Sequence, residues 1–237
     1  MLFHSSYTAL LTPFKDNQID LDSYRNLIDF QIENGTHGLV PVGTTGESPT
    51  LSHDEHKKLV EVCIEQSNGR VPVIAGAGSN STSEAVDFVK HACAAGADGI
   101  LVVTPYYNKP TQSGLLAHYK ELIKNSNKPI IIYDIPGRSV IKMSDDTMAE
   151  LAKNELIVGV KDATADLARP TRLQNMIGDD FIQLSGEDGT ALAYLAAGGH
   201  GCISVTANIA PNLLSRMHNA WKQGDITTAQ EINKKLM

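Results

Sequence analysis

The stretch Ile157-Val158-Gly159-Val160-Lys161 decides the fold and the chemistry expected of this 237-residue chain. Its β-branched residues are typical of a buried parallel strand, and the run ends abruptly in a lysine. An ammonium group in apolar surroundings loses hydration, which lowers its pKa and raises the fraction of free amine at neutral pH. A free amine at a strand end is the group that forms a Schiff base with a carbonyl substrate. The alternative reading is a lysine that simply reaches solvent beyond the strand.

Seven similar apolar runs accompany this one, and stretches with helical spacing separate them. Eight strand–helix repeats with short turns predict a parallel sheet, and the number eight favours a closed (β/α)₈ TIM barrel. An open doubly wound sheet is the alternative, because sequence spacing does not show closure. The other seven predicted strands are 7–11, 38–42, 71–75, 99–103, 129–133, 181–185 and 201–205.

Several helix boundaries are marked in the sequence. Residues 21–35 carry apolar positions at helical spacing, and Gly35 is placed to end that helix. Residues 52–55 read as a capping box, while Ser81 or Ser83 begins the helix that runs to residue 96. Residues 144–146 begin another helix after the fifth strand.

The chain divides by these patterns into a catalytic barrel, residues 1–224, and the start of a C-terminal helical region, residues 225–237. Residues 211–224 read as the eighth barrel helix and 226–237 as a further one. The sequence stops inside that helix at Lys234-Lys235-Leu236-Met237, without a C-cap. We therefore expect a truncated helical extension.

Composition restricts the function classes. A formal net charge of −7 argues against a general nucleic-acid surface or an anionic membrane surface. No apolar stretch is long enough to span a bilayer, and the first residues do not resemble a signal peptide. Cys63, Cys93 and Cys202 are widely spaced in apolar segments, which favours reduced, buried thiols. A cytoplasmic protein is expected.

Polar residues follow most of the predicted strands, and in a barrel these positions gather at one rim. An amine there can attack a ketone, hydroxyls and nearby amides can hold a carboxylate, a phenol can move protons, and a guanidinium can grip a second carboxylate. Each group also has a structural alternative: a tight turn, core packing or a surface ion pair. The rim segments are 12–13, 43–47, 104–108, 133–138 and 161–164.

Two other motifs are discounted. Residues 76–81, Gly-Ala-Gly-Ser-Asn-Ser, begin like a dinucleotide fingerprint but lack the third glycine and belong to the third strand–helix unit. His53 and His56 are three residues apart near a helix start, yet no third ligand stands at motif spacing. We therefore predict neither a nucleotide site nor a metal site.

At these strand ends the sequence resembles the pyruvate-dependent class I aldolases and lyases, and among them the dihydrodipicolinate synthase family. The resemblance covers essentially the whole chain in the family's order. Two modest departures are Asp134, where asparagine is usual, and Ser139, where threonine is usual; Asp134 adds negative charge near Arg138. The matching segments are 43–48, 103–110, 133–138, 159–164 and 199–205.

The resemblance implies a lyase that condenses pyruvate with L-aspartate 4-semialdehyde to give 4-hydroxy-tetrahydrodipicolinate, in lysine (diaminopimelate) biosynthesis. It implies that Lys161 forms the Schiff base, so that no separate cofactor is needed. It further implies a proton relay and a set of substrate-binding residues. The implied relay is Tyr133, Thr44 and Tyr107, with Tyr107 lent by a neighbouring subunit; Thr45 holds the pyruvate carboxylate, Arg138 that of the semialdehyde, and the backbone around Ile203 lines the pocket.

The resemblance also implies a homodimer or homotetramer and feedback inhibition by L-lysine at the dimer interface. In regulated members of the family, the residues that bind lysine match Ser48, His53, His56, Asn80, Glu84 and Tyr106. Glu84 can pair with an ammonium group, whereas Asn80 and the Tyr106 hydroxyl can donate to a carboxylate.

Three competing functions remain at this point. A sibling pyruvate lyase, such as N-acetylneuraminate lyase or a 2-keto-3-deoxy sugar acid aldolase, would share Lys161 and Tyr133, but Arg138 suits a small second carboxylate better than a neutral polyol. A barrel that binds pyridoxal phosphate on Lys161 would use the glycines near residues 198–201 for phosphate. A binding barrel without catalysis would not be trapped by borohydride with pyruvate.

Overall fold

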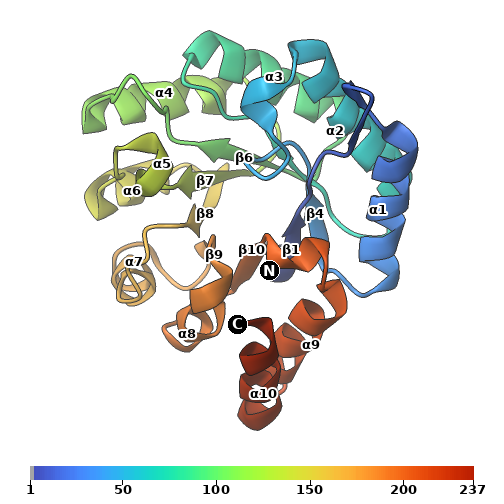
Figure 1. Cartoon of the computed structure of the whole chain (residues 1–237). Helices are drawn as coiled ribbons and strands as arrows, with labels where there is room; N and C mark the ends of the chain where they lie inside the picture. Colours follow the sequence, from blue (N-terminus) through green and yellow to red (C-terminus); the bar gives the residue numbers. More distant parts are fainter. Residues whose placement is uncertain (1–2) are drawn as a thin grey trace.

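The computed structural model describes residues 3–237. Eight parallel strands form one sheet, and helices surround it (Figure 1). Each strand lies within a few residues of its predicted run, and the third is shifted most, because Pro72 lies in its predicted first half. The strands are β1 (Ser5–Ala9), β4 (Gly38–Val40), β5 (Ile74–Gly76), β6 (Gly99–Val103), β7 (Ile130–Asp134), β8 (Ile157–Asp162), β9 (Ile182–Ser185) and β10 (Gly201–Ser204).

The sheet closes on itself. Its order is β4-β1-β10-β9-β8-β7-β6-β5, so the first and last strands of the chain are neighbours. A parallel bridge between Leu39 and Val73, with the Leu39 N–H donating to the Pro72 carbonyl at 3.0 Å, joins the two ends of that order. The (β/α)₈ barrel is therefore confirmed, and the open doubly wound alternative is wrong.

Alternation along the strands sorts side chains into two layers. Ile131, Tyr133 and Leu184 belong to the cluster inside the barrel, whereas Ile132 and Val160 belong to the cluster between the strands and the helices. Because successive side chains of a strand point to opposite faces, Lys161 points into the barrel and Asp162 points away from it. The alternation thus delivers the lysine to the interior at the carboxyl end of β8.

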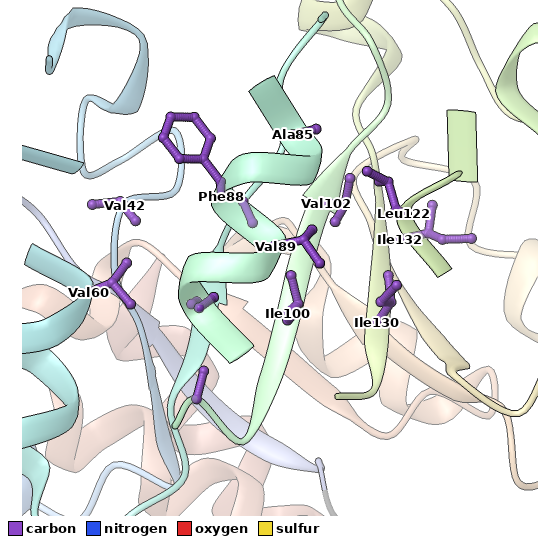
Figure 2. Packing of buried hydrophobic residues seen from close by; sticks show 14 of the residues in the cluster. Val42, Val60, Ala85, Phe88, Val89, Ile100, Val102, Leu122, Ile130 and Ile132 are labelled. Atoms are coloured by element: carbon purple, nitrogen blue, oxygen red, sulfur yellow. The ribbon is translucent and has the colours of Figure 1, made fainter. Parts of the chain in front are cut away.

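The outer layer is the main apolar core. Helix α3 (Thr82–Ala95) turns Val89 toward the outward residues of β6 and β7, which include Ile100 and Ile132, whereas its Phe88 points away from these strands (Figure 2). The predicted N-caps are confirmed where the sequence marked them: residues 52–55 form a capping box, and Ser81 stands at the N-cap of α3. The capping box fixes where α2 (His53–Ser67) starts behind its strand, whereas the Ser81 side chain makes no cap hydrogen bond.

Ten α-helices occur in residues 3–237, with three short 3₁₀ helices at Ser48–Thr50, Asp188–Thr190 and Thr206–Asn208. Two features lie outside the predicted pattern: a small hairpin of β2 (Phe14–Lys15) with β3 (Gln18–Ile19), and the one-turn helix α5. The helices are α1 (Leu21–Glu33), α2 (His53–Ser67), α3 (Thr82–Ala95), α4 (Gln112–Lys124), α5 (Pro136–Ser139), α6 (Asp145–Leu151), α7 (Arg169–Ile177), α8 (Ala191–Ala196), α9 (Pro211–Lys222) and α10 (Ile226–Leu236).

The last two helices form a separate apolar cluster at the side of the barrel (Figure 1). Ala229 and Ile232 of α10 pack with Leu214 and Met217 of α9. The turn between these helices contains Gly224, whose φ of 77° is in the left-handed region, and this is the expected boundary of the barrel. Among the described helices, none is long and apolar enough to cross a membrane.

Candidate active site

Lys161 and Tyr133 face each other on the inner wall of the barrel. They are register partners in the β7–β8 ladder, and the Lys161 Nζ lies 4.1 Å from the centroid of the Tyr133 ring. Each side chain is only 5% exposed. The sequence left open whether this lysine simply reaches solvent, and the structure shows that it does not.

Burial controls the acid–base state of this pair. Desolvation lowers the pKa of Lys161 to about 8, although Cys202 and Asp188 nearby oppose that change. Desolvation raises the pKa of Tyr133, while a hydrogen bond with Thr44 and the charge of Arg138 work in the opposite direction. Near neutral pH the amine is therefore partly free, whereas the phenol keeps its proton.

Two residues beside Lys161 were not predicted as part of the site. Gly186 follows β9, and a Cβ atom there would lie 3.2 Å from Lys161 Cε. Asp188 accepts hydrogen bonds from the Ser204 hydroxyl and from the backbone N–H groups of Val205 and Thr206, at 2.9 and 3.0 Å. Asp188 thereby ties the end of β9 to the end of β10. Gly186 and Asp188 come just after the predicted strand 181–185, and this position was the sequence feature that could have indicated them.

The predicted turn after the second strand lies at the same rim. The Gly46 and Glu47 N–H groups donate to the carbonyls of Gly43 and Thr44, both at 3.1 Å, and the Thr12 hydroxyl donates to the Gly46 carbonyl at 2.7 Å. The backbone N–H groups of Thr44 and Thr45 have no hydrogen-bond acceptor among the described residues. This turn therefore presents two N–H groups and two hydroxyls that can hold a carboxylate.

Ile203 lies on β10 and belongs to the same inner cluster as Tyr133, on the wall of the barrel. Arg138 is exposed on α5, close enough to Tyr133 to lower the pKa of the phenol. The expectation that Asp134 adds negative charge near Arg138 is wrong. Asp134 points to the outer layer and forms an ion pair of 2.7 Å with buried Arg169, because adjacent residues of a strand face opposite sides.

Tyr107 does not join the site of its own chain. Its side chain is 85% exposed, and its φ of 72° is in the left-handed region. The Asn108 N–H donates to the Tyr106 carbonyl at 2.9 Å, so Tyr107 is the central residue of a strained γ-turn. The fold holds a tyrosine out into solvent at a cost in backbone energy.

A cavity of about 160 Å³ is lined by most of the residues matched to lysine binding. Five of the six line it, namely Ser48, His53, His56, Glu84 and Tyr106. The sixth, Asn80, is not among the lining residues, and its carbonyl accepts a hydrogen bond from Asn108 Nδ2 at 2.9 Å. The sequence positions of these residues span three strand–helix units, which only the tertiary fold brings together.

The polar side chains that line this cavity differ in their partners and in their burial. His53 Nε2 lies 2.6 Å from Glu84 Oε1, and the Ser79 hydroxyl also bonds Glu84. His56 stacks on Phe88 with ring centroids 4.0 Å apart, and desolvation lowers its pKa to about 4. The two histidines thus have other partners, and residues 3–237 contain no group of three or more His, Cys, Asp or Glu side chains arranged to hold a metal.

Fold and site together define a class. A closed barrel whose inner wall presents a desolvated lysine beside a phenol, at the carboxyl ends of the strands, has the arrangement of the Schiff-base-forming aldolases and lyases. The comparisons with known proteins identify the family within this class. The model of the dihydrodipicolinate synthetase family matches residues 2–237.

The relatives agree with that match. The 4-hydroxy-tetrahydrodipicolinate synthase of Bradyrhizobium diazoefficiens is 60% identical over 235 residues, covering 99% of this chain and 79% of its own length. The dihydrodipicolinate synthase structure from Aquifex aeolicus superposes with a TM-score of 0.97 at 44% identity, covering 99% of this chain and 80% of that one. The enzyme of Cyanidioschyzon merolae, solved with lysine bound, superposes with a TM-score of 0.96 at 36% identity. The match covers 100% of this chain and 81% of that one.

The chain belongs to the dihydrodipicolinate synthetase family and is a lyase. The predicted synthase function, in lysine biosynthesis, is confirmed over the sibling aldolase reading.

Proposed function

We propose that Lys161 is the residue through which this chain condenses pyruvate with L-aspartate 4-semialdehyde. The observation that carries the proposal is the buried amine on the inner wall, 4.1 Å from the Tyr133 ring centroid, with a pKa lowered to about 8. The free amine attacks the pyruvate ketone and water leaves, which gives an iminium ion. Loss of a methyl proton then gives an enamine, so the lysine itself carries the chemistry and no bound cofactor is required.

The enamine carbon attacks the aldehyde of the semialdehyde, and the aldehyde oxygen takes up a proton. The amino group of the same substrate then attacks the former ketone carbon and closes the ring, which releases the free amine of Lys161. Tyr133 keeps its proton at neutral pH and lies near Thr44, which acts to lower the pKa of the phenol, so Tyr133 can pass protons to and from the leaving oxygen. Tyr107 of a neighbouring copy completes the relay in this proposal.

Two sets of donors hold the two carboxylates. The N–H groups of Thr44 and Thr45, with the Thr45 hydroxyl, bind the pyruvate carboxylate, supported by their place in a turn that Thr12 braces. The Arg138 guanidinium binds the carboxylate of the semialdehyde, supported by its exposure at the rim beside Tyr133. The inner wall formed by Ile203 completes the pocket.

The test is trapping with borohydride in the presence of pyruvate, followed by peptide mass spectrometry. One three-carbon adduct is expected on Lys161 and none in Lys161→Ala. Lys142→Ala is the matched control, because Lys142 is half exposed and pairs with Asp166 at 3.5 Å. An adduct that maps to another lysine, or that persists in Lys161→Ala, contradicts the assignment.

We also propose that L-lysine inhibits this chain by binding in the cavity formed by Ser48, His53, His56, Glu84 and Tyr106. Glu84 would pair with an ammonium group of the inhibitor, and the Tyr106 hydroxyl would donate to its carboxylate. The support is the shared cavity and the lysine-bound relative. Asn80 remains in the proposal through its backbone contact with Asn108.

Glu84→Gln keeps the shape of the side chain and removes its charge, so it should raise the lysine concentration for half-inhibition at least about tenfold while leaving turnover within about twofold. Glu61→Gln is the control, because Glu61 pairs with His91 on the outer side of the same helices. Turnover unchanged by millimolar lysine in the parent protein would contradict the proposal.

We further propose that the working unit is at least a dimer, in line with a homodimer or homotetramer, supported by the exposed and strained Tyr107. The free thiols of Cys63, Cys93 and Cys202 support function in the reducing cytoplasm.

A further inference from the structure

Arg169, at the first position of α7, has a guanidinium that is 0% exposed in the layer behind the active-site strands. Its Nη1 donates to Asp134 Oδ2 at 2.7 Å, its Nη2 to the Met143 carbonyl at 2.9 Å, and its Nε to Asp145 Oδ1 at 2.9 Å. Burial raises the pKa of Asp134, and the Arg169 charge opposes that rise. The condensation mechanism makes no use of this arginine.

Asp134 and Met143 are the two ends of the loop that carries Arg138. The Met143 N–H donates to Asp134 Oδ1 at 3.3 Å, so Asp134, Met143 and Arg169 form a closed ring of three hydrogen bonds at the base of that loop. A surface loop with joined ends is a compact unit whose tip follows the position of its base. Arg138 lies near the middle of that loop, in α5, and is exposed.

The loop is also held by the one-turn helix α5 and by Gln112 Nε2, which donates to a loop carbonyl at 2.9 Å. The Ser139 hydroxyl is within 2.9 Å of the Ile135 and Ile141 carbonyls, which braces the interior of the loop. Val140, however, is 61% exposed with a φ of 70°, a strained conformation for a β-branched residue. Strain of this kind persists only where the surrounding structure imposes it; the Val140 N–H is bonded to a carbonyl of α5, and the hydrogen-bonded base joins the two ends of the loop.

We propose that Arg169 is a positioning residue: by closing the base of the loop 135–142, it holds Arg138 at the place where the carboxylate of the second substrate binds. The inference rests on the proposed function, because it takes Arg138 as the ligand of that carboxylate. A buried guanidinium that left Asp134 or Met143 would leave charges and a carbonyl unpaired, so the base has one low-energy arrangement. The planar fork of arginine reaches both partners at once, which an ammonium group does not.

Arg169→Lys keeps the charge and removes the fork. We expect its KM for aspartate 4-semialdehyde to rise at least about tenfold, while its KM for pyruvate changes less than about twofold. Amide hydrogen exchange in 135–142 should become faster, with exchange in β6 unchanged; β8 is not the reference, because Arg169 Nη1 lies 3.7 Å from Asp162 Oδ2 at its end. Arg172→Lys is the matched control on the same helix, because Arg172 is 43% exposed and shares Asp145 with Arg169 but makes no ion pair or hydrogen bond with Asp134 or Met143.

Equal changes in both KM values, or unchanged exchange in 135–142, would overturn the inference, since a merely structural arginine affects both substrates alike. If Arg169→Lys does not fold, Asp134→Asn removes one charged acceptor of the ring. It should also raise the KM for aspartate 4-semialdehyde more than the KM for pyruvate, though by a smaller factor. An unaltered ratio of the two KM values in a folded Asp134→Asn protein would likewise overturn it.

Arg138→Ala separates this inference from the proposed function. If Arg138→Ala raises the semialdehyde KM and Arg169→Lys does not, the positioning role is wrong and the substrate assignment stands. If Arg138→Ala leaves that KM unchanged, the substrate assignment is wrong and the positioning role is overturned with it. Faster exchange in 135–142 would then show only that Arg169 closes the loop.

Discussion

Gly186 leaves open the space in which the Lys161 side chain lies. A Cβ atom at position 186 would be 3.2 Å from Lys161 Cε and 2.9 Å from Ala163 Cβ. The contact with Ala163 is shorter than folded proteins allow and the contact with Lys161 is tighter than most, so the neighbours would have to move. The side chain that can move most easily is the lysine, and its position sets the distance to the Tyr133 ring.

Gly186→Ala should therefore lower the rate of borohydride trapping with pyruvate about tenfold, because the amine is displaced from its attacking position. The φ of Gly186 is outside the left-handed region, so backbone strain does not explain the loss. Gly137→Ala is the control, because a Cβ there meets no atom within 4 Å. An unchanged trapping rate in Gly186→Ala would show that the lysine does not depend on this space.

The pH dependence of trapping should report the lowered pKa of Lys161. With a pKa of about 8, the free amine increases about tenfold from pH 6 to pH 7 and levels off above about pH 9. The initial rate of adduct formation at fixed pyruvate should follow the same curve. A rate that continues to rise tenfold per pH unit through pH 9 would indicate an ordinary, solvated lysine.

The same burial should cost stability. The folded-state pKa of Lys161 is about 8 and the ordinary pKa of a lysine is 10.5, so the unfolded chain binds more protons between these values and stability rises with pH through that window. Below pH 8, burial of the charged lysine lowers the free energy of unfolding by about 3 kcal/mol. Lys161→Met should therefore unfold at higher urea than the parent at pH 7, and the difference should shrink at pH 10. A difference that stays constant with pH would contradict this account.

Tyr107 should act in trans. Its exposed, strained position suits a side chain that enters a neighbour's site rather than its own. Mixing inactive Tyr107→Phe protein with inactive Lys161→Ala protein should restore part of the activity, because one kind of mixed site then contains every group. The absence of any recovery, with subunit exchange verified by native mass spectrometry, would count against sharing.

Thr12 should matter through the turn that it braces. Thr12→Val removes the hydroxyl that donates to the Gly46 carbonyl at 2.7 Å, with a cost of about 1 kcal/mol in stability. The KM for pyruvate should rise several-fold, because the Thr44 and Thr45 donors lose their fixed orientation. Thr50→Val is the control, since its exposed hydroxyl bonds the Glu47 carbonyl at 3.0 Å outside the pocket. Equal KM values in the two variants would exclude a role for Thr12.

Much of the fold and part of the site could be predicted from the sequence alone. The apolar runs and their spacing predicted eight strands, and the polar residues that follow most of these runs predicted the rim of the barrel. Local chemistry sufficed for these features, because strand alternation and helix caps depend on residues close together in the chain. Lys161 and the turn at residues 43–47 were found in this way.

The tertiary structure decided which distant residues meet. Nothing local distinguishes Asp134 facing Arg138 from Asp134 facing Arg169, which is 35 positions away in the sequence. Nor does spacing show that Gly186 borders Lys161, that five matched residues share one cavity, or that Tyr107 is exposed. Periodicity fixes the face of a strand on which a side chain lies, but partners across the barrel and the desolvation of Lys161 exist only after the sheet closes.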